Sequence, residues 1–366
     1  MNSLLRMTCI VTIGLPLAIA AQSASVPKKS NDKSAKPEKV VPAGHLVPIE
    51  TVTSASETAT SFGTPLTCDD DGNVYLQSDN FGASGIRKIN PKGERVALFQ
   101  PTADADLKVA GIGYFALDPD DDLYEIAFSK TEVARYVMVY KSDGQYKSTI
   151  KLQPGFAITP SQLAVFPSGG LLVSGLKYDK DRTKAMLPFT GIFSSSGVLL
   201  KELSLEDDDA LHDMATAGDS RVASSTNPQA NHAIEFGRME MADDGNAYLM
   251  RWTAPTIFYV ISPGGSVERR FVVDPGDAAF HPFDVHIAGG RIAVLYFQPQ
   301  TKEKRMVIVD LEGHEIAKYD ELYEDGKRKY TEIGLAFACY TENPQQFTFL
   351  GASDGDKLQI TTAEAR

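Results

Sequence analysis

The residue types closest to a metal motif lie in one short segment, His281-Pro282-Phe283-Asp284-Val285-His286. Imidazole nitrogens and a carboxylate are ligands that zinc accepts. On a regular strand, residues at odd separations face opposite sides, so His281 diverges from Asp284 and from His286. A shared zinc ion would need a bend at Pro282 and further ligands from elsewhere. We therefore expect one histidine to line a channel and the other to lie on the surface.

Three carboxylates offer the oxygen ligands that calcium prefers, namely Glu235, Asp284 and Glu332. They would be the metal ligands of a metal-dependent hydrolase or a lyase, and Ca²⁺ is the ion that such a site would take. No asparagine accompanies them at an equivalent position. We therefore predict no cofactor for this protein, and we keep the calcium site as an alternative prediction.

Other kinds of chemistry have no local motif in this sequence. There is no G-x-S-x-G elbow for a nucleophilic serine. No P-loop or G-x-G-x-x-G segment opens a helix after a strand, so nucleotide binding is not indicated. The formal net charge is −12, without a basic stripe, and such a surface repels phosphate backbones. Nucleic acid is therefore not an expected partner.

The elements that must position these residues come from a repeated phrase. An apolar run, an acidic or Gly turn and a second apolar run recur at intervals of about 45 to 55 residues, with the first turns at Asp71, Asp121, Gly169, Asp244 and Gly289. Gly and Asp-Gly suit tight turns because Gly accepts a positive φ without steric cost. In the first copy we expect strands over residues 66–69, 74–77, 85–89 and 95–99.

This pattern predicts an all-β, six-bladed β-propeller. A sixth, degenerate copy begins at Leu335 and supplies three strands. We expect its missing outer strand to come from residues 45–52, so that the N-terminal strand closes the last blade and removes an exposed edge. The propeller would span residues 44–366, with an insertion at about 206–235.

Two of the three cysteines, Cys68 and Cys339, occupy equivalent places in neighbouring blades. Cys68 and Cys339 each precede the first turn of a copy by a few residues, one in the first blade and one in the last. A disulfide there would staple the closed ring. Two buried free thiols are the alternative, because adjacent inner strands can hold the Cα atoms beyond ~7 Å.

The phrases also resemble a known repeat. PLTCDDDGNVYL and EMADDGNAYL are similar to the Asp-x-Asp-Gly-Asn-x-Tyr core of NHL-type repeats. From residue 45 to 366 the chain resembles the six-bladed propeller superfamily of NHL-repeat and gluconolactonase-type proteins. The third and fifth copies keep the turn glycines and lose the Asp and Asn. The resemblance implies a fold shared by lactonases, an amidating lyase, scaffold domains and ligand binders.

Loop lengths distinguish the two faces of the predicted ring. The turns between the first and second, and the third and fourth, strands of each copy are tight, whereas the connections on the opposite face are long and polar. Function in such scaffolds concentrates in irregular loops, so we expect the ligand site at the channel mouth on the long-loop face. The residues predicted to line it are Gln162, Glu235, Arg238, Trp252, His281, Asp284 and Glu332.

The N-terminal segment predicts export. Arg6, an apolar run over residues 7–19 and a small-x-small site at residues 18–20 indicate a signal peptide within residues 1–24. Residues 25–43, rich in Lys, Pro and Ser, indicate a flexible linker. No stretch has the ~18 apolar residues of a membrane span. We expect a secreted or periplasmic protein.

Together these features favour a propeller that binds a small-molecule or protein ligand through its long-loop face without catalysis of its own. The absence of a coherent acid, base or metal set at the mouth supports this interpretation over the hydrolase or lyase. The ligand itself is not specified by the sequence.

Overall fold

The structure is a computed structural model that describes residues 44–366 except 60–62, 78–84, 179–186, 206–227, 325–326, 330–333, 335 and 354. All described residues lie in one compact unit, Val40–Arg366. The predicted signal peptide and linker lie outside the described residues. No helix among the described residues is long and apolar enough to cross a membrane.

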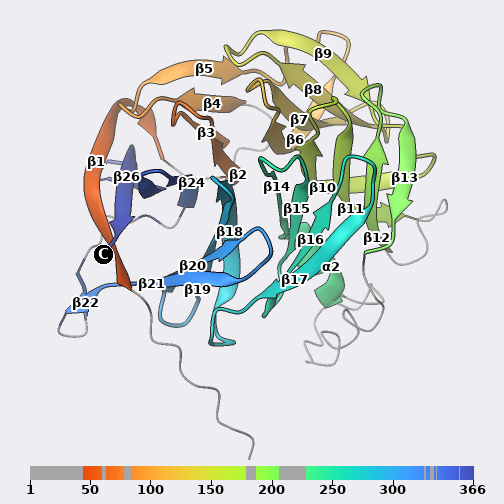
Figure 1. Cartoon of the computed structure of the whole chain (residues 1–366). Helices are drawn as coiled ribbons and strands as arrows, with labels where there is room; N and C mark the ends of the chain where they lie inside the picture. Colours follow the sequence, from red (N-terminus) through yellow and green to blue (C-terminus); the bar gives the residue numbers. More distant parts are fainter. Residues whose placement is uncertain are drawn as a thin grey trace, which may run out of the picture. The chain divides into compact units, whose positions relative to one another are not determined.

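The repeated phrases form antiparallel sheets in a propeller-like, all-β arrangement around a centre (Figure 1). Four sheets have four strands each, in chain order. The first sheet contains β2(Gly63–Cys68), β3(Val74–Gln77), β4(Ile86–Ile89) and β5(Arg95–Phe99). The second contains β6(Val109–Leu117), β7(Leu123–Ser129), β8(Arg135–Tyr140) and β9(Tyr146–Lys151). The third contains β10(Ala157–Val165), β11(Leu171–Tyr178), β12(Leu187–Phe193) and β13(Leu199–Leu203). The fourth contains β14(Arg238–Met241), β15(Ala247–Arg251), β16(Thr256–Ile261) and β17(Val267–Val273).

The last sheet is larger than expected, with eight strands. One half contains β18(His281–Ala288), β19(Arg291–Gln298), β20(Glu303–Asp310) and β21(Glu315–Glu321). The other half contains β24(Ala336–Glu342), β25(Gln345–Ala352), β26(Lys357–Ala365) and β1(Gly44–Thr58). A separate short ribbon pairs β22(Tyr323–Glu324) with β23(Lys327–Arg328), and the helix α2(Pro228–Glu235) precedes β14. The halves join because β1 pairs in parallel with β21 at three positions, from Gly44↔Tyr319 to Leu46↔Glu321.

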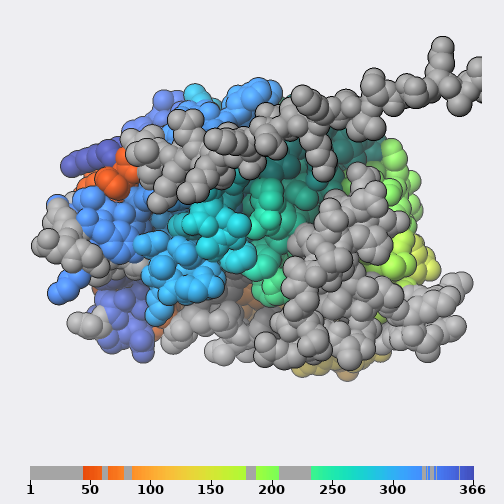
Figure 2. Space-filling view, turned by 90° about the horizontal axis from the view of Figure 1, so that it is seen from below, coloured from red at the N-terminus to blue at the C-terminus, as the bar shows by residue number. Residues whose placement is uncertain are grey.

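The N-terminal strand pairs with the C-terminal one, as the sequence predicts. β1 runs antiparallel to β26, from Leu46↔Ala365 to Thr58↔Lys357. The first strands of the copies are neighbours in the order β2, β6, β10, β14, β18 and β24, and β24 lies beside β2. Figure 2, seen from below, shows the later strands in teal to blue next to one another on the surface. The pairing of the two chain ends thus closes the circle of inner strands.

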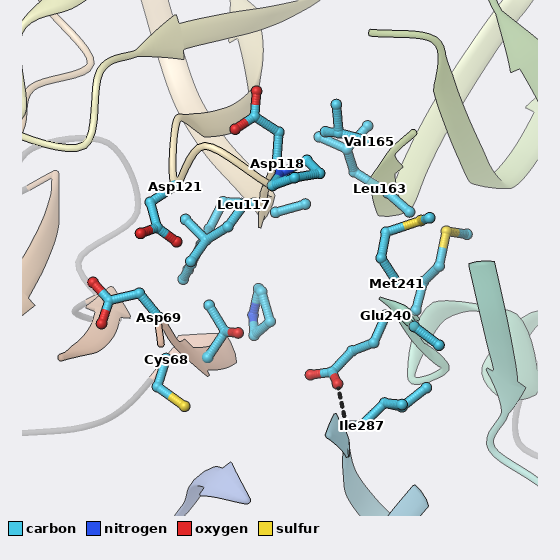
Figure 3. Close-up of a pocket in the computed structure, with 18 of the residues that line it drawn as sticks. Cys68, Asp69, Leu117, Asp118, Asp121, Leu163, Val165, Glu240, Met241 and Ile287 are labelled. Atoms are coloured by element: carbon cyan, nitrogen blue, oxygen red, sulfur yellow. Dashed lines mark hydrogen bonds between the residues drawn. The ribbon is translucent and has the colours of Figure 1, made fainter. Parts of the chain in front are cut away.

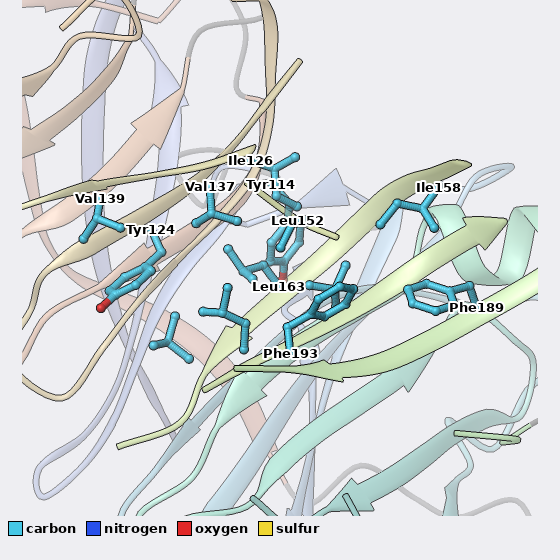
Figure 4. Close-up of a cluster of buried hydrophobic side chains, with 13 residues drawn as sticks. Tyr114, Tyr124, Ile126, Val137, Val139, Leu152, Ile158, Leu163, Phe189 and Phe193 are labelled. Atoms are coloured by element: carbon cyan, nitrogen blue, oxygen red, sulfur yellow. The ribbon is translucent and has the colours of Figure 1, made fainter. Parts of the chain in front are cut away.

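Apolar side chains from neighbouring sheets fill the space between them. In one cluster, Tyr114 and Val137 of the second sheet pack with Leu163, Phe189 and Phe193 of the third (Figure 4). Burying one such Val, Leu or Phe side chain contributes roughly 1.5–3 kcal/mol. Successive side chains of a strand point to opposite faces of its sheet. Because each sheet packs between two neighbouring sheets, apolar residues are needed on both faces.

The two cysteines are joined. Cys68 at the end of β2 forms a disulfide with Cys339 on β24, with the Cα atoms 5.6 Å apart. The bond connects residues separated by 271 positions and fastens the inner strands of the first and last copies. Of the two alternatives left open by the sequence, the structure supports the disulfide.

Replacing both cysteines tests how far this bond supports the ring. We expect the Cys68→Ser/Cys339→Ser variant to lose about 3–5 kcal/mol of unfolding free energy, because the open chain regains loop-closure entropy. Urea denaturation of the oxidised protein, the variant and the reduced protein measures the difference. The reduced protein should match the variant; equal stability of all three would contradict the assigned role.

One carboxyl group is buried in the core between the first two sheets. Glu125 on β7 is 0% exposed. Its Oε2 accepts a 3.5 Å hydrogen bond from Tyr140, whose hydroxyl also donates to the Gln100 carbonyl at 2.8 Å. Burial outweighs the Tyr140 hydrogen bond and raises the pKa of Glu125 to about 8. The neutral acid is therefore the form that the fold accommodates.

This burial makes stability fall as pH rises. Between the unfolded pKa of 4.5 and the folded pKa of about 8, the unfolded chain has released the proton that the folded chain keeps. Stability should then drop by up to ~1.4 kcal/mol per pH unit. We expect Glu125→Gln to remove this part of the slope. Urea denaturation of both proteins from about pH 5 to pH 8 isolates it, since other groups titrate alike; a pH-independent difference would contradict it.

Candidate functional site

The long-loop face is organised around the helix α2. This helix is the described part of the predicted insertion; residues 206–227 lie outside the described residues. Ala233 and Ile234 are buried, whereas His232 and Glu235 are exposed. α2 packs on β10, β11 and β12 of the third sheet, so the helix covers the ends of that sheet and leads directly into β14.

Two predicted ligand residues bind the carbonyl groups at the end of α2. Gln162 is 0% exposed, and its Nε2 donates to the carbonyls of Ile234 and Gly237. Arg238 donates from Nη1 to the carbonyls of Phe236 at 3.2 Å and Gly237 at 2.9 Å. A helix end leaves such carbonyls without intrahelical donors. Gln162 and Arg238 thus fix where α2 ends and β14 begins.

A third predicted residue completes this buried network. Arg238 Nε lies 3.2 Å from Asp284 Oδ1, and a β-bulge between Pro282 and Asp284 interrupts the pairing of β18 at this point. Burial raises the pKa of Asp284 despite the charge of Arg238. The Asp284 Oδ2 and Gln162 Oε1 atoms have no hydrogen-bond partner in the described structure. The fold therefore brings together three predicted site residues that are distant in sequence, Gln162, Arg238 and Asp284, and buries them in the interior.

An aromatic cluster lies beside the network. We define it as His232, Phe236, Trp252 and His281. The Trp252 and His281 rings stack with centroids 5.2 Å apart and 13° between planes, and His232 meets Trp252 edge-on at 4.9 Å. The Trp252 backbone N–H donates to the Ala233 carbonyl at 2.9 Å. Phe236 is 47% exposed and contacts both His232 and Trp252.

Neither histidine of the segment 281–286 is fully exposed, so the expected surface histidine is not found. His281 is half-buried in the aromatic cluster, and His286 is 4% exposed rather than on the surface. His286 Nδ1 lies 2.7 Å from Glu240 Oε1, and its Nε2 contacts the Phe337 carbonyl at 3.1 Å. Although burial opposes the charged imidazole, Glu240 raises the pKa of His286 to about 9. The carboxylate partner comes from β14, which the spacing of the segment alone does not reveal.

The proposed metal ligands do not assemble in the described structure. Asp284 is paired with Arg238, Glu235 is exposed, and Glu332 lies outside the described residues. Among the described residues, no group of three or more His, Cys, Asp or Glu side chains could hold a metal ion.

A cavity that the sequence does not predict lies at the opposite, tight-turn face. It has a volume of about 500 Å³ and is lined by the ends of β2, β6, β10 and β14, the turns that follow them, and Ile287. Figure 3 shows Asp69, Asp118, Asp121 and Glu240 around it. The recurring acidic turns are the signal in the sequence that points to this cavity. Their convergence on one space follows only from ring closure.

Comparison with known proteins gives little further guidance. The chain matches no protein-family model and no curated protein. Its structure is similar to the PQQ-bound aldose sugar dehydrogenase of Streptomyces coelicolor, with 12% identity, 89% of this chain and 100% of that chain covered, and a TM-score of 0.45. Hydrazine synthase of Kuenenia stuttgartiensis follows with 13% identity, coverages of 81% and 79%, and a TM-score of 0.42. Likenesses at this level carry no conclusion about activity.

Removing the guanidinium of Arg238 tests the buried network. We expect Arg238→Met to lose about 3–5 kcal/mol of unfolding free energy, because Asp284 stays buried without its cation. Adding Asp284→Asn should recover part of this loss. Urea denaturation measures both effects, and the fluorescence of Trp252, the only tryptophan, reports whether the end of α2 moves. Strictly additive losses in a double-mutant cycle would contradict the coupling.

Proposed function

We propose that this chain is an exported, six-bladed β-propeller that binds a protein partner through its long-loop face and has no catalytic activity of its own. The observation that carries the proposal is the aromatic cluster, in which Phe236 is 47% exposed and contacts the rings of His232 and Trp252. Exposed aromatic side chains held by packed neighbours are typical energetic anchors of protein interfaces.

The strand order supports a count of six blades. The eight-stranded sheet consists of two four-stranded halves, each of which repeats the order of the other sheets from inner to outer strand. Only the three pairs between β1 and β21 join these halves. We also propose that the repeats are NHL-like. This proposal is based on the turn residues of two copies, PLTCDDDGNVYL and EMADDGNAYL.

A protein partner fits the cluster better than a sugar. Sugar rings bind by stacking on an open aromatic face, but His281 already stacks on Trp252, and His232 packs edge-on against it. The exposed members are His232 and, just after the end of α2, Phe236, which is the apolar one of the two. Burying this ring in a pocket of a partner would remove apolar surface from water without disturbing the stack beneath.

The metal-dependent hydrolase or lyase has less support. Its ligand Asp284 is buried, and its Oδ1 lies 3.2 Å from the guanidinium of Arg238, so calcium would have to bind beside a fixed positive charge. Export has one supporting observation besides the predicted signal peptide, because a disulfide such as Cys68–Cys339 persists in oxidising compartments.

Photo-crosslinking in the cells that produce the chain tests the partner. Benzoyl-phenylalanine is placed at Phe236 or, as the control, at Leu200 on β13, which is 64% exposed and outside the cluster. We expect a discrete adduct from position 236 only. The identified partner, once purified, should bind Phe236→Ala at least roughly tenfold more weakly, as for an interface anchor.

The control variant Leu200→Ala should bind the partner with unchanged affinity. Equal adducts from both positions, no adduct from position 236, or an unaltered affinity of Phe236→Ala would each overturn the proposal. Melting temperatures of both variants show whether any loss comes from unfolding.

A further inference from the structure

The cavity at the tight-turn face belongs to neither the aromatic cluster nor the buried network. Its volume of about 500 Å³ lies within the ~300–1,000 Å³ of small-molecule sites. Tyr114 is part of its lining; this residue is 7% exposed, and its hydroxyl is hydrogen-bonded to both the N–H and the carbonyl of Met239 at 3.2 Å. The lining is therefore rigid and belongs to strands of different sheets.

The charge of the lining has a single sign. It includes six carboxylate residues and no Lys, Arg or His. Two of the six are compensated from outside the cavity, because Lys88 lies 2.8 Å from Asp69 and His286 lies 2.7 Å from Glu240. The residues without a salt bridge among the described side chains are Asp70, Asp118, Asp121 and Asp243.

Two of these aspartates are held where water is partly excluded. Asp118 and Asp121 are half-buried, and burial raises the pKa of both. The carboxylate of Asp69 adds to the rise at Asp121, whereas the backbone N–H groups of residues 120 and 122 oppose it at Asp118. Their charge is thus poorly solvated, and neither carboxylate forms a salt bridge among the described side chains, although Lys88, paired with Asp69, also attracts Asp121. A positive group placed among them would relieve this repulsion, with an energy greater than at an open surface.

The walls between the carboxylates are apolar. Leu117, Met241 and Ile287 line the cavity and are half-exposed, although side chains of these types are usually buried in a core. Figure 3 shows them on different sides of the space, with the carboxylate of Glu240 between Met241 and Ile287. A bare metal ion would leave this apolar surface uncovered.

From the cavity, its uncompensated charge and its apolar walls we infer that the tight-turn end of the channel binds an organic cation, an ammonium group attached to an apolar body. The ammonium group lies near Asp118 and Asp121, and the apolar body covers Leu117, Met241 and Ile287. This site is separate from the partner surface at the long-loop face and does not depend on it.

Calorimetry with a charged and an uncharged probe of equal length tests the inference. Hexylammonium and 1-hexanol are titrated into the full-length protein at low and at high salt, with CaCl₂ as a third titrant. We expect hexylammonium to bind at least roughly tenfold more tightly than hexanol, and more weakly at high salt, because its charge contributes and is screened. Equal binding of both probes, no binding of hexylammonium, or binding of Ca²⁺ alone would overturn it.

Asp121→Asn is the informative variant. Asp121 has a φ of 60°, a conformation that Asn also adopts readily, so the turn should survive. We expect hexylammonium to bind roughly three- to tenfold more weakly, while hexanol is unaffected. Asp143→Asn is the matched control, since Asp143 lies in another tight turn of the same face but not in the cavity. Equal losses in both variants would show a general charge effect and overturn the site.

Discussion

The structure depends on the closure of a ring by strands from opposite ends of the chain. β1 pairs with β26 along most of its length, and the Cys68–Cys339 bond fastens the inner strands at the same junction. Without this closure two sheets would present unpaired edges. The central cavity would also lose its definition, because its lining comes from strands that are neighbours only around the closed circle. Both proposed binding regions therefore depend on the β1–β26 pairing and the disulfide, although neither region includes these residue pairs as binding groups.

Inside the ring, buried polar groups determine where the helix α2 ends and where the proposed partner surface lies. Gln162 and Arg238 donate hydrogen bonds to the Gly237 carbonyl just after α2, and Asp284 forms a salt bridge with Arg238. Such a network is costly to bury and strongly directional. Its effect is to set the exit of the helix, and with it the position of Phe236. Gln162, Arg238 and Asp284, which the sequence predicts as ligand-binding residues, are therefore buried beneath the exposed ring of Phe236 and support it.

The sequence was sufficient for local structure and for chain closure. Turn glycines and apolar runs predicted β3 and β5 with the observed bounds, residues 74–77 and 95–99, because tight turns and alternation are local properties. They did not reveal the β1–β21 pairing, which depends on how far the N-terminal strand extends. Nor did they reveal that His286 pairs with Glu240, since depth in the channel depends on strand tilt and bulges, which have no local pattern.

The two ends of the channel differ because the chain crosses them differently. At the tight-turn end, short acidic turns leave space between the strand ends, and negative charge accumulates where no basic residue follows. At the long-loop end, one insertion supplies the helix α2, which packs on the third sheet and whose His232 contacts Phe236 and Trp252. A propeller repeats its strands but not its loops, so chemical asymmetry arises between faces rather than between blades. That asymmetry gives the two ends of one ring different chemistry, with an aromatic cluster at one end and an acidic cavity at the other.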